Sequence, residues 1–143
     1  MILDVITFTI ANKKFAADLQ KVPIILSADQ YLPYDFTLIN PNYFFYYNQY
    51  EIELLNLAKL LELDNCKVDE KTKILVGQNG NEMFGFLVDE VNEIINLNGE
   101  IEANLYEYQN NKSKYILGEL NIFGEKLEII KVEEILKNKI QEF

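Results

Sequence analysis

The chain has 143 residues, yet it contains no histidine, no arginine and no tryptophan, and it has a single cysteine, Cys66. Without histidine it lacks the commonest general base and transition-metal ligand. Without arginine it has no planar cation that could clamp a phosphate or a carboxylate at two points. One cysteine rules out an intramolecular disulfide and a cysteine-based zinc site. These absences argue against most enzyme classes, and we expect neither a cofactor nor a metal.

Positive charge is also scarce, because 13 lysines face 23 acidic residues and the net charge is −10. Such a surface repels nucleic acid and anionic lipid. No apolar run approaches the length of a membrane span. The apolar start, Met1–Ala11, carries Asp4 and has no basic residues ahead of it, so a signal peptide is not expected. We therefore expect a cytoplasmic protein that neither binds nucleic acid nor inserts into a membrane.

The remaining pattern is that of short strands in a globular chain. Hydrophobic residues make up 49% of the chain, and its length suits a single unit over residues 1–143, or two small subdomains that share a core. About nine or ten short apolar runs are separated by frequent turn signals, which favours small closed barrels. A short helix capped by Asn56 and a C-terminal helix with an apolar stripe complete the prediction. The fold class is therefore all-β with short helices. The predicted strands include Val5–Ile10, Phe15–Leu19, Val22–Leu26, Phe36–Ile39, Tyr43–Tyr47, Tyr50–Leu54, Lys73–Gln78, Met83–Val88, Tyr115–Phe123 and Lys126–Ile130.

The most informative segment runs from Thr72 to Ile101. Its first strand is followed at once by Asn79-Gly80, the strongest two-residue hairpin signal, which predicts a type I′ turn. The returning strand has Gly85 in its middle, which indicates close approach of another group or a bend. In the last hairpin, Gly124-Glu125 suits a type II′ turn.

Strand, Asn-Gly turn, Gly-interrupted strand and then Val88-Asp89-Glu90-Val91 resemble the central signature of the CheW-like domain family. The likeness extends over nearly the whole chain. Lys14–Asp18 followed by Lys21-Val22 resembles the family's second strand, and Glu51–Leu57 resembles the strand that usually ends in Val-Ile-Asp-Leu. Tyr115–Gly118 and Leu127–Leu136 resemble its closing strands and helix.

The resemblance implies a fold and a role. The fold is two small five-stranded Src-homology-3-like β-barrels that share a hydrophobic core, with a C-terminal helix. The role is that of a non-catalytic adaptor that couples chemoreceptors to a CheA-type histidine kinase in bacterial chemotaxis. Its partners would be the regulatory domain of the kinase, docked on one barrel, and the cytoplasmic tip of a methyl-accepting chemoreceptor, held in the groove between the barrels.

The chain departs from the family's pattern at three places. Where the family usually carries Asn-Leu-Arg-Gly, this chain has Tyr46-Tyr47-Asn48-Gln49, so a planar cation is lost. Glu53 replaces the usual Pro, and Ile24 replaces the Glu of Val-x-Glu-Ile. The alternative is therefore a divergent CheW-like scaffold that has lost receptor or kinase contact and serves another signalling complex. A small two-carboxylate hydrolase is the third hypothesis, and it requires an open acidic cleft with a raised carboxylate pKa.

The candidate partner-binding residues come from three stretches of the chain. The aromatic run Tyr43–Tyr47 could fill the barrel or form a binding surface. The successive apolar residues after Lys21 could line a receptor groove or be buried on two sides. Asp89 and Glu90 are expected to be solvated or to cap a turn. An exposed apolar patch of Val22, Ile25 and Phe45 is the sharpest form of the hypothesis. The full candidate set is Val22, Ile24, Ile25, Phe45, Asn48, Val88 and Asp89.

Overall fold

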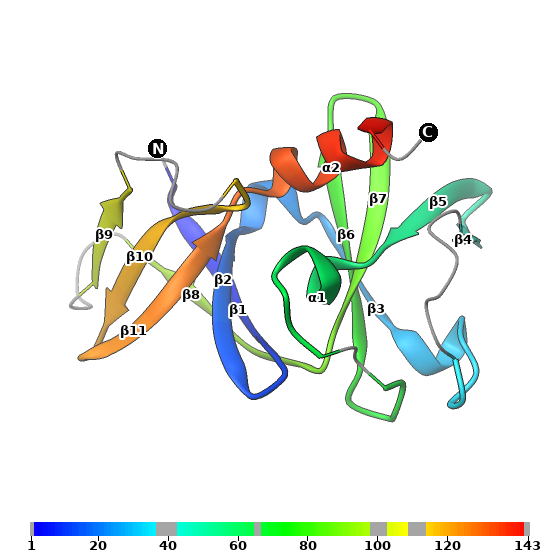
Figure 1. Cartoon of the computed structure of the whole chain (residues 1–143), viewed down its shortest axis with the longest axis horizontal. Coiled ribbons are helices and arrows are strands. Elements are labelled where there is room, and N and C mark those ends of the chain that lie inside the picture. Colours follow the sequence, from blue (N-terminus) through cyan, green and yellow to red (C-terminus); the bar gives the residue numbers. More distant parts are fainter. Residues whose placement is uncertain (1, 37–42, 65–66, 98–102, 109–113, 142–143) are drawn as a thin grey trace.

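The computed structural model describes residues 2–36, 43–64, 67–97, 103–108 and 114–141, and these form two twisted sheets side by side (Figure 1). We call the six-stranded sheet the first barrel and the five-stranded sheet the second barrel. The first runs in the order β8 (Glu90–Asn96), β1 (Asp4–Ile10), β2 (Lys13–Asp18), β11 (Glu125–Ile130), β10 (Ile116–Ile122) and β9 (Ala103–Glu107). The second runs in the order β3 (Ile24–Ser27), β6 (Lys73–Asn79), β7 (Glu82–Val88), β5 (Tyr50–Leu55) and β4 (Tyr43–Tyr47).

The predicted fold class is confirmed: the chain is mostly β, in two barrel-like sheets with few helices. The first barrel has six strands rather than five, because β8 and β9 occupy its two edges. Helix α1 (Leu57–Leu60) begins after Asn56, whose Oδ1 accepts a hydrogen bond of 3.1 Å from the Lys59 N–H. Helix α2 (Val132–Gln141) lies across the junction of the barrels (Figure 1).

The predicted strand Val22–Leu26 is wrong in its first half. Leu19–Lys21 forms a turn of 3₁₀-helix capped by Asp18, and strand β3 begins only at Ile24. Pro23 cannot donate a ladder hydrogen bond, and it lies just before this edge strand. Most of the predicted strand Phe36–Ile39, like Cys66, lies outside the described residues.

Both predicted turn types are also wrong, because each hairpin has the turn type that was predicted for the other. Asn79 pairs with Glu82, so the turn residues are Gly80 and Asn81, and φ is positive at Gly80 (63°) but not at Asn81. That is a type II′ turn. In the last hairpin the turn residues are Phe123 (φ 50°) and Gly124 (φ 80°), which make a type I′ turn. The strand register shifted each turn by one residue.

One hydrophobic core joins the two barrels. Phe8 on β1 stacks on Phe15 of β2 and also meets Phe86 of β7, with ring centroids 6.0 and 6.1 Å apart. The barrels therefore share packing. The cluster takes side chains from both sheets and both helices: Ile6, Phe8, Ile10, Phe15, Ala17, Val22, Leu55, Leu57, Ala58, Leu75, Phe84, Phe86, Val88, Ile116, Ile130, Val132, Ile135 and Leu136.

Candidate protein-binding surface

The expected exposed patch of Val22, Ile25 and Phe45 does not exist as a patch. Val22 is 1% exposed and lies in the shared core, and Phe45 is 6% exposed in the core of the second barrel. Ile25 alone of the three faces outward, with 39% of its surface exposed. Val88 is buried as well. A partner can therefore touch few of the apolar residues in the candidate set directly.

Phe45 is buried because Gly85 on β7, two strands away in the sheet, leaves space for its ring. Strand β4 alternates, so Phe45 faces inward, while Phe44 and Tyr46 face outward. A Cβ atom added at Gly85 would lie 3.3 Å from Phe45 Cε1 and 2.8 Å from Ile74 Cγ2. The prediction that Gly85 marks a close approach is confirmed, since the Phe45 ring and Ile74 pack against its bare backbone.

The two isoleucines of β3 face opposite ways. Ile24 packs against the core of the second barrel beside Leu26, and Ile25 lies on the other face opposite Leu75 of β6. The strand is an edge of its sheet. The expectation that one residue of the apolar run faces outward is therefore met at Ile25.

Asp89 lies where the chain passes from β7 of the second barrel to β8 of the first. Its Oδ2 accepts a hydrogen bond of 2.7 Å from the Ala11 N–H, and its own N–H donates to the Thr9 carbonyl at 2.9 Å. Ala11 stands in the β1–β2 turn with φ 50°. Asp89 therefore ties that turn to the crossover between barrels, and this agrees with the capping interpretation.

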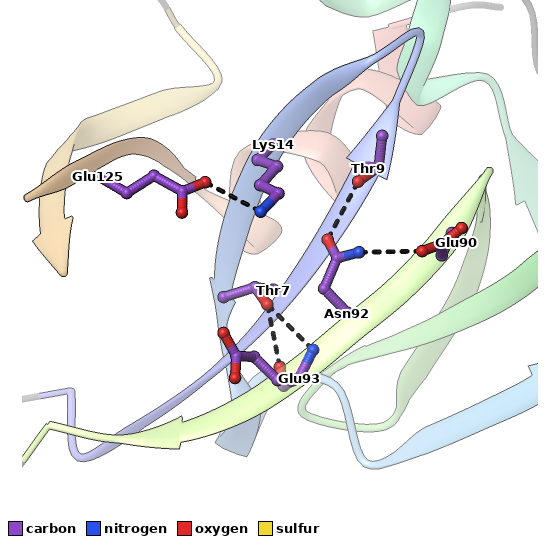
Figure 2. A network of polar contacts seen from close by, with 7 residues as sticks. All are labelled: Thr7, Thr9, Lys14, Glu90, Asn92, Glu93 and Glu125. Carbon is purple, nitrogen blue, oxygen red and sulfur yellow. Dashed lines mark hydrogen bonds and ion pairs between the residues drawn. The ribbon is translucent and has the colours of Figure 1, made fainter. Parts of the chain in front are cut away.

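A polar network continues from this crossover along β8 (Figure 2). Thr7, which is buried, donates from Oγ1 to the Glu93 carbonyl at 3.2 Å and accepts from the Glu93 N–H at 3.1 Å. The pairing of β1 with β8 shifts at this point, leaving Asn92 as the extra residue of a β-bulge. Asn92 accepts from Thr9 Oγ1 and donates to Glu90 Oε1. These bonds hold the edge strand β8 against β1.

The exposed aromatic residues were not in the candidate set. On the β4–β5 hairpin Phe44 is 42% exposed, and Tyr46 and Tyr50 are more exposed still. At the other end of the molecule, Phe123 occupies the β10–β11 turn (Figure 1). Aromatic side chains dominate the energetics of protein interfaces. Alternation along Tyr43–Tyr47 places Phe44 and Tyr46 on one face of the strand, but the all-aromatic sequence does not show which face is exposed.

The tip of the same hairpin carries Asn48, the candidate at the position where the family usually has Arg. Asn48 (φ 47°) and Gln49 (φ 69°) are the turn residues, which gives a type I′ turn. Asn tolerates this conformation well, whereas Gln does not. Asn48 is exposed, so its side chain is accessible to a partner.

Acidic groups gather near the second barrel's 28–36 loop. Asp29 is the main cause that raises the pKa of Tyr34, and Glu70 and Asp69 add to the effect. Backbone hydrogen bonding from Lys71 lowers the pKa of Asp69 itself.

The structure gives little support to the hydrolase hypothesis. A cavity of about 680 Å³ is lined by Asp18, Glu107 and Glu133 among others. Desolvation pushes the pKa of Glu133 upward, but the hydrogen bond from Lys21 and the nearby positive charge outweigh it, so the pKa is lowered. A general acid would need the opposite shift. Within the part of the chain that the structure describes, no group of three or more potential metal ligands comes together.

None of the described helices is long and apolar enough to cross a membrane.

Two barrel-like sheets that share a core and expose aromatic side chains are suited to offering a protein-binding surface. The CheW-like domain model matches residues 4–139, so the chain belongs to the CheW-like domain family. This membership supports a scaffold or adaptor role in chemotaxis signalling rather than a catalytic one. No curated protein matches the sequence.

A solved structure shares the fold of this chain. The chain is similar in fold to the scaffolding protein TtCheW from Thermoanaerobacter tengcongensis, with a TM-score of 0.70. The match covers 92% of this chain and 85% of that one at 16% sequence identity. At that level of sequence identity, the similarity shows a shared fold and nothing more.

Proposed function

We propose that this chain is a non-catalytic adaptor that couples chemoreceptors to a CheA-type histidine kinase. The observation that carries the proposal is the position of its exposed aromatic side chains. Phe44, Tyr46 and Tyr50 lie on the second barrel. Phe123 lies in the β10–β11 turn, which Figure 1 shows at the end of the first barrel far from the second. The β4–β5 hairpin thus offers a surface for one partner, and Phe123 offers a separate contact on the first barrel.

Phe123 supports a binding role for the first barrel. It is 70% exposed, and its φ of 50° is a conformation that favours Gly, Asn or Asp over a bulky residue. A left-handed conformation costs an ordinary residue roughly 1–2 kcal/mol. An exposed ring gains no packing that would offset that cost within the chain, so a contact with a partner is a reason for its presence.

The kinase's regulatory domain would dock on the β4–β5 hairpin, with Asn48 and the outward aromatic side chains in contact. The receptor tip would lie in the groove between barrels, against Ile25 and the crossover held by Asp89. The less exposed candidates would act indirectly, because their packing holds the strands that carry these contacts in place. They are Val22, Ile24, Phe45 and Val88. Receptor state would then bias the kinase through differential contacts with the adaptor.

Calorimetric titration with the regulatory domain of a CheA-type kinase from the same organism tests the proposal. We expect saturable binding at about micromolar strength, typical of small interfaces that gain strength in arrays. Tyr46→Ser should weaken binding, while Glu82→Gln, an exposed change in the β6–β7 hairpin, should not. A folded wild-type protein that does not bind would contradict the kinase contact.

A second candidate function rests on the hairpin tip. Without the family's usual Arg and Gly, the chain could be a divergent scaffold that serves another signalling complex. Asn48→Arg separates the two. A large gain in kinase binding would indicate drift from an adaptor ancestor, and no gain together with no wild-type binding would favour a new partner.

A further inference from the structure

The outward face of the β4–β5 hairpin pairs each exposed aromatic residue with a glutamate. Phe44 stands opposite Glu53, and Tyr46 stands opposite Glu51. The hydroxyl of Tyr46 donates to Glu51 Oε2 at 3.3 Å, so ring and carboxylate lie side by side. Glu53 is buried, whereas Glu51 is exposed. Tyr46 and Glu51 therefore form an accessible pair on an edge strand.

No cation belonging to the hairpin neutralises this pair. Residues 43–55 contain two glutamates and neither lysine nor arginine. The first barrel is different, because there Lys14 pairs with Glu125 at 3.0 Å and Lys13 pairs with Glu128. Those pairs are complete within the chain, and the hairpin's glutamate is bonded only by a neutral hydroxyl among the contacts described.

An aromatic ring beside a carboxylate is a suitable site for a guanidinium or ammonium group. The cation is attracted by the face of the ring and by the charge of the carboxylate together. Arginine suits the arrangement best, because its planar group stacks on a ring while its N–H groups donate to an acid. The hairpin turn, where the family usually supplies an arginine, carries Asn48.

We propose that the Tyr46–Glu51 pair receives an arginine or lysine from the docked kinase regulatory domain, so that the cation of this interface comes from the partner. The proposal rests on the adaptor function stated above. It predicts a basic docking strand on the partner, held by its charge against the acidic hairpin. Phe44 supplies the apolar contact beside it.

The test measures binding of the same regulatory domain by calorimetry at two salt concentrations. For the wild type we expect affinity to fall about tenfold between about 0.05 M and about 0.5 M salt, because screening weakens interfacial charge pairs. Glu51→Lys should lower affinity by about tenfold or more at low salt, and Glu51→Gln by less. Glu82→Lys makes the same change of net charge elsewhere on the second barrel, and it should have a much smaller effect.

The outcomes separate the two proposals. Wild-type binding that is insensitive to salt and to Glu51→Lys would overturn the cation site and leave the adaptor function standing. Equal losses for Glu51→Lys and Glu82→Lys would overturn it too, because net charge alone would then explain the effect. Absence of wild-type binding at either salt concentration would overturn both. Far-ultraviolet circular dichroism of each variant excludes unfolding as the cause.

Discussion

Val22 and Ile25 are neighbours in an apolar run, yet they have opposite environments. Val22 is 1% exposed because it follows the 3₁₀ turn and packs in the shared core. Ile25 is 39% exposed because it lies on the edge strand β3, although its cross-strand neighbour Leu75 is buried. Hydrophobicity alone could not separate them. The 3₁₀ turn at Leu19–Lys21 interrupts the alternation of inward and outward side chains. The alternation in β2 therefore does not predict which residues after the turn are buried.

The pair gives a direct test at the residue scale. Val22→Glu should destabilise the fold by about 3 kcal/mol or more, because it places an unpaired charge in the core. Ile25→Glu should cost about 1 kcal/mol or less, because the side chain reaches water. Urea unfolding followed by circular dichroism measures both. A Val22→Glu variant as stable as the wild type would contradict the placement of Val22.

Gln49 supplies a second prediction at this scale. Its φ of 69° is left-handed, and Gly adopts that conformation without the steric penalty. Gln49→Gly should therefore stabilise the protein by about 1 kcal/mol. Gln78→Gly, in a regular strand, should destabilise it by roughly 0.5–1 kcal/mol. Thermal unfolding of the two variants compares them, and equal signs would argue against the turn geometry.

At the scale of elements, helix α2 is fixed at its start by the chain that leads into β3. Lys21 Nζ lies 2.6 Å from Glu133 Oε2, and Glu133 is in the first turn of the helix. The carboxylate also suits the positive end of the helix dipole. Both side chains remain partly exposed, so the pair is expected to contribute only about 0.2–1 kcal/mol.

The pair makes stability depend on pH in a defined direction. Since the folded pKa of Glu133 is lowered, its ionised form stabilises the fold above the ordinary value of 4.5, and this contribution is lost as the pH falls through the folded pKa. The stability advantage of the wild type over Glu133→Gln should therefore be full near neutral pH and shrink in acid. Denaturant unfolding across that range measures it. An advantage that grows in acid would contradict the ion pair.

On the scale of the whole molecule, the two barrels share one core, and we expect them to unfold as one cooperative unit. Phe8 from the first barrel meets Phe86 from the second, and both are fully buried. The chain also crosses between the sheets at the β7–β8 junction, where Asp89 holds the β1–β2 turn. Neither barrel can lose its packing without exposing the other's.

We therefore expect a single unfolding transition, with calorimetric and van't Hoff enthalpies in agreement. Phe8→Ala should lower the unfolding free energy by about 3–5 kcal/mol while keeping one transition. Hydrogen exchange should give β1 and β6 the same opening free energy. Two separate transitions would show that the barrels unfold independently.

The sequence by itself determined the all-β class, most strand positions, the Asn56 cap and the family, because these follow from local periodicity, turn residues and motif spacing. It also placed Gly85 at a close approach. These local signals depend on neighbouring residues in the sequence, so they hold wherever the strand forms.

Only the tertiary structure decided which residues reach the surface. Phe45 is buried because Gly85 lies beneath it, the hairpin turns took their types from the cross-strand register, and Phe44, Tyr46 and Phe123 were left outside. The physical reason is that burial depends on what packs against a strand, and register on which residues pair across the sheet. Burial and register both depend on contacts between segments that are far apart in sequence. The residue pattern of a single strand does not contain this information.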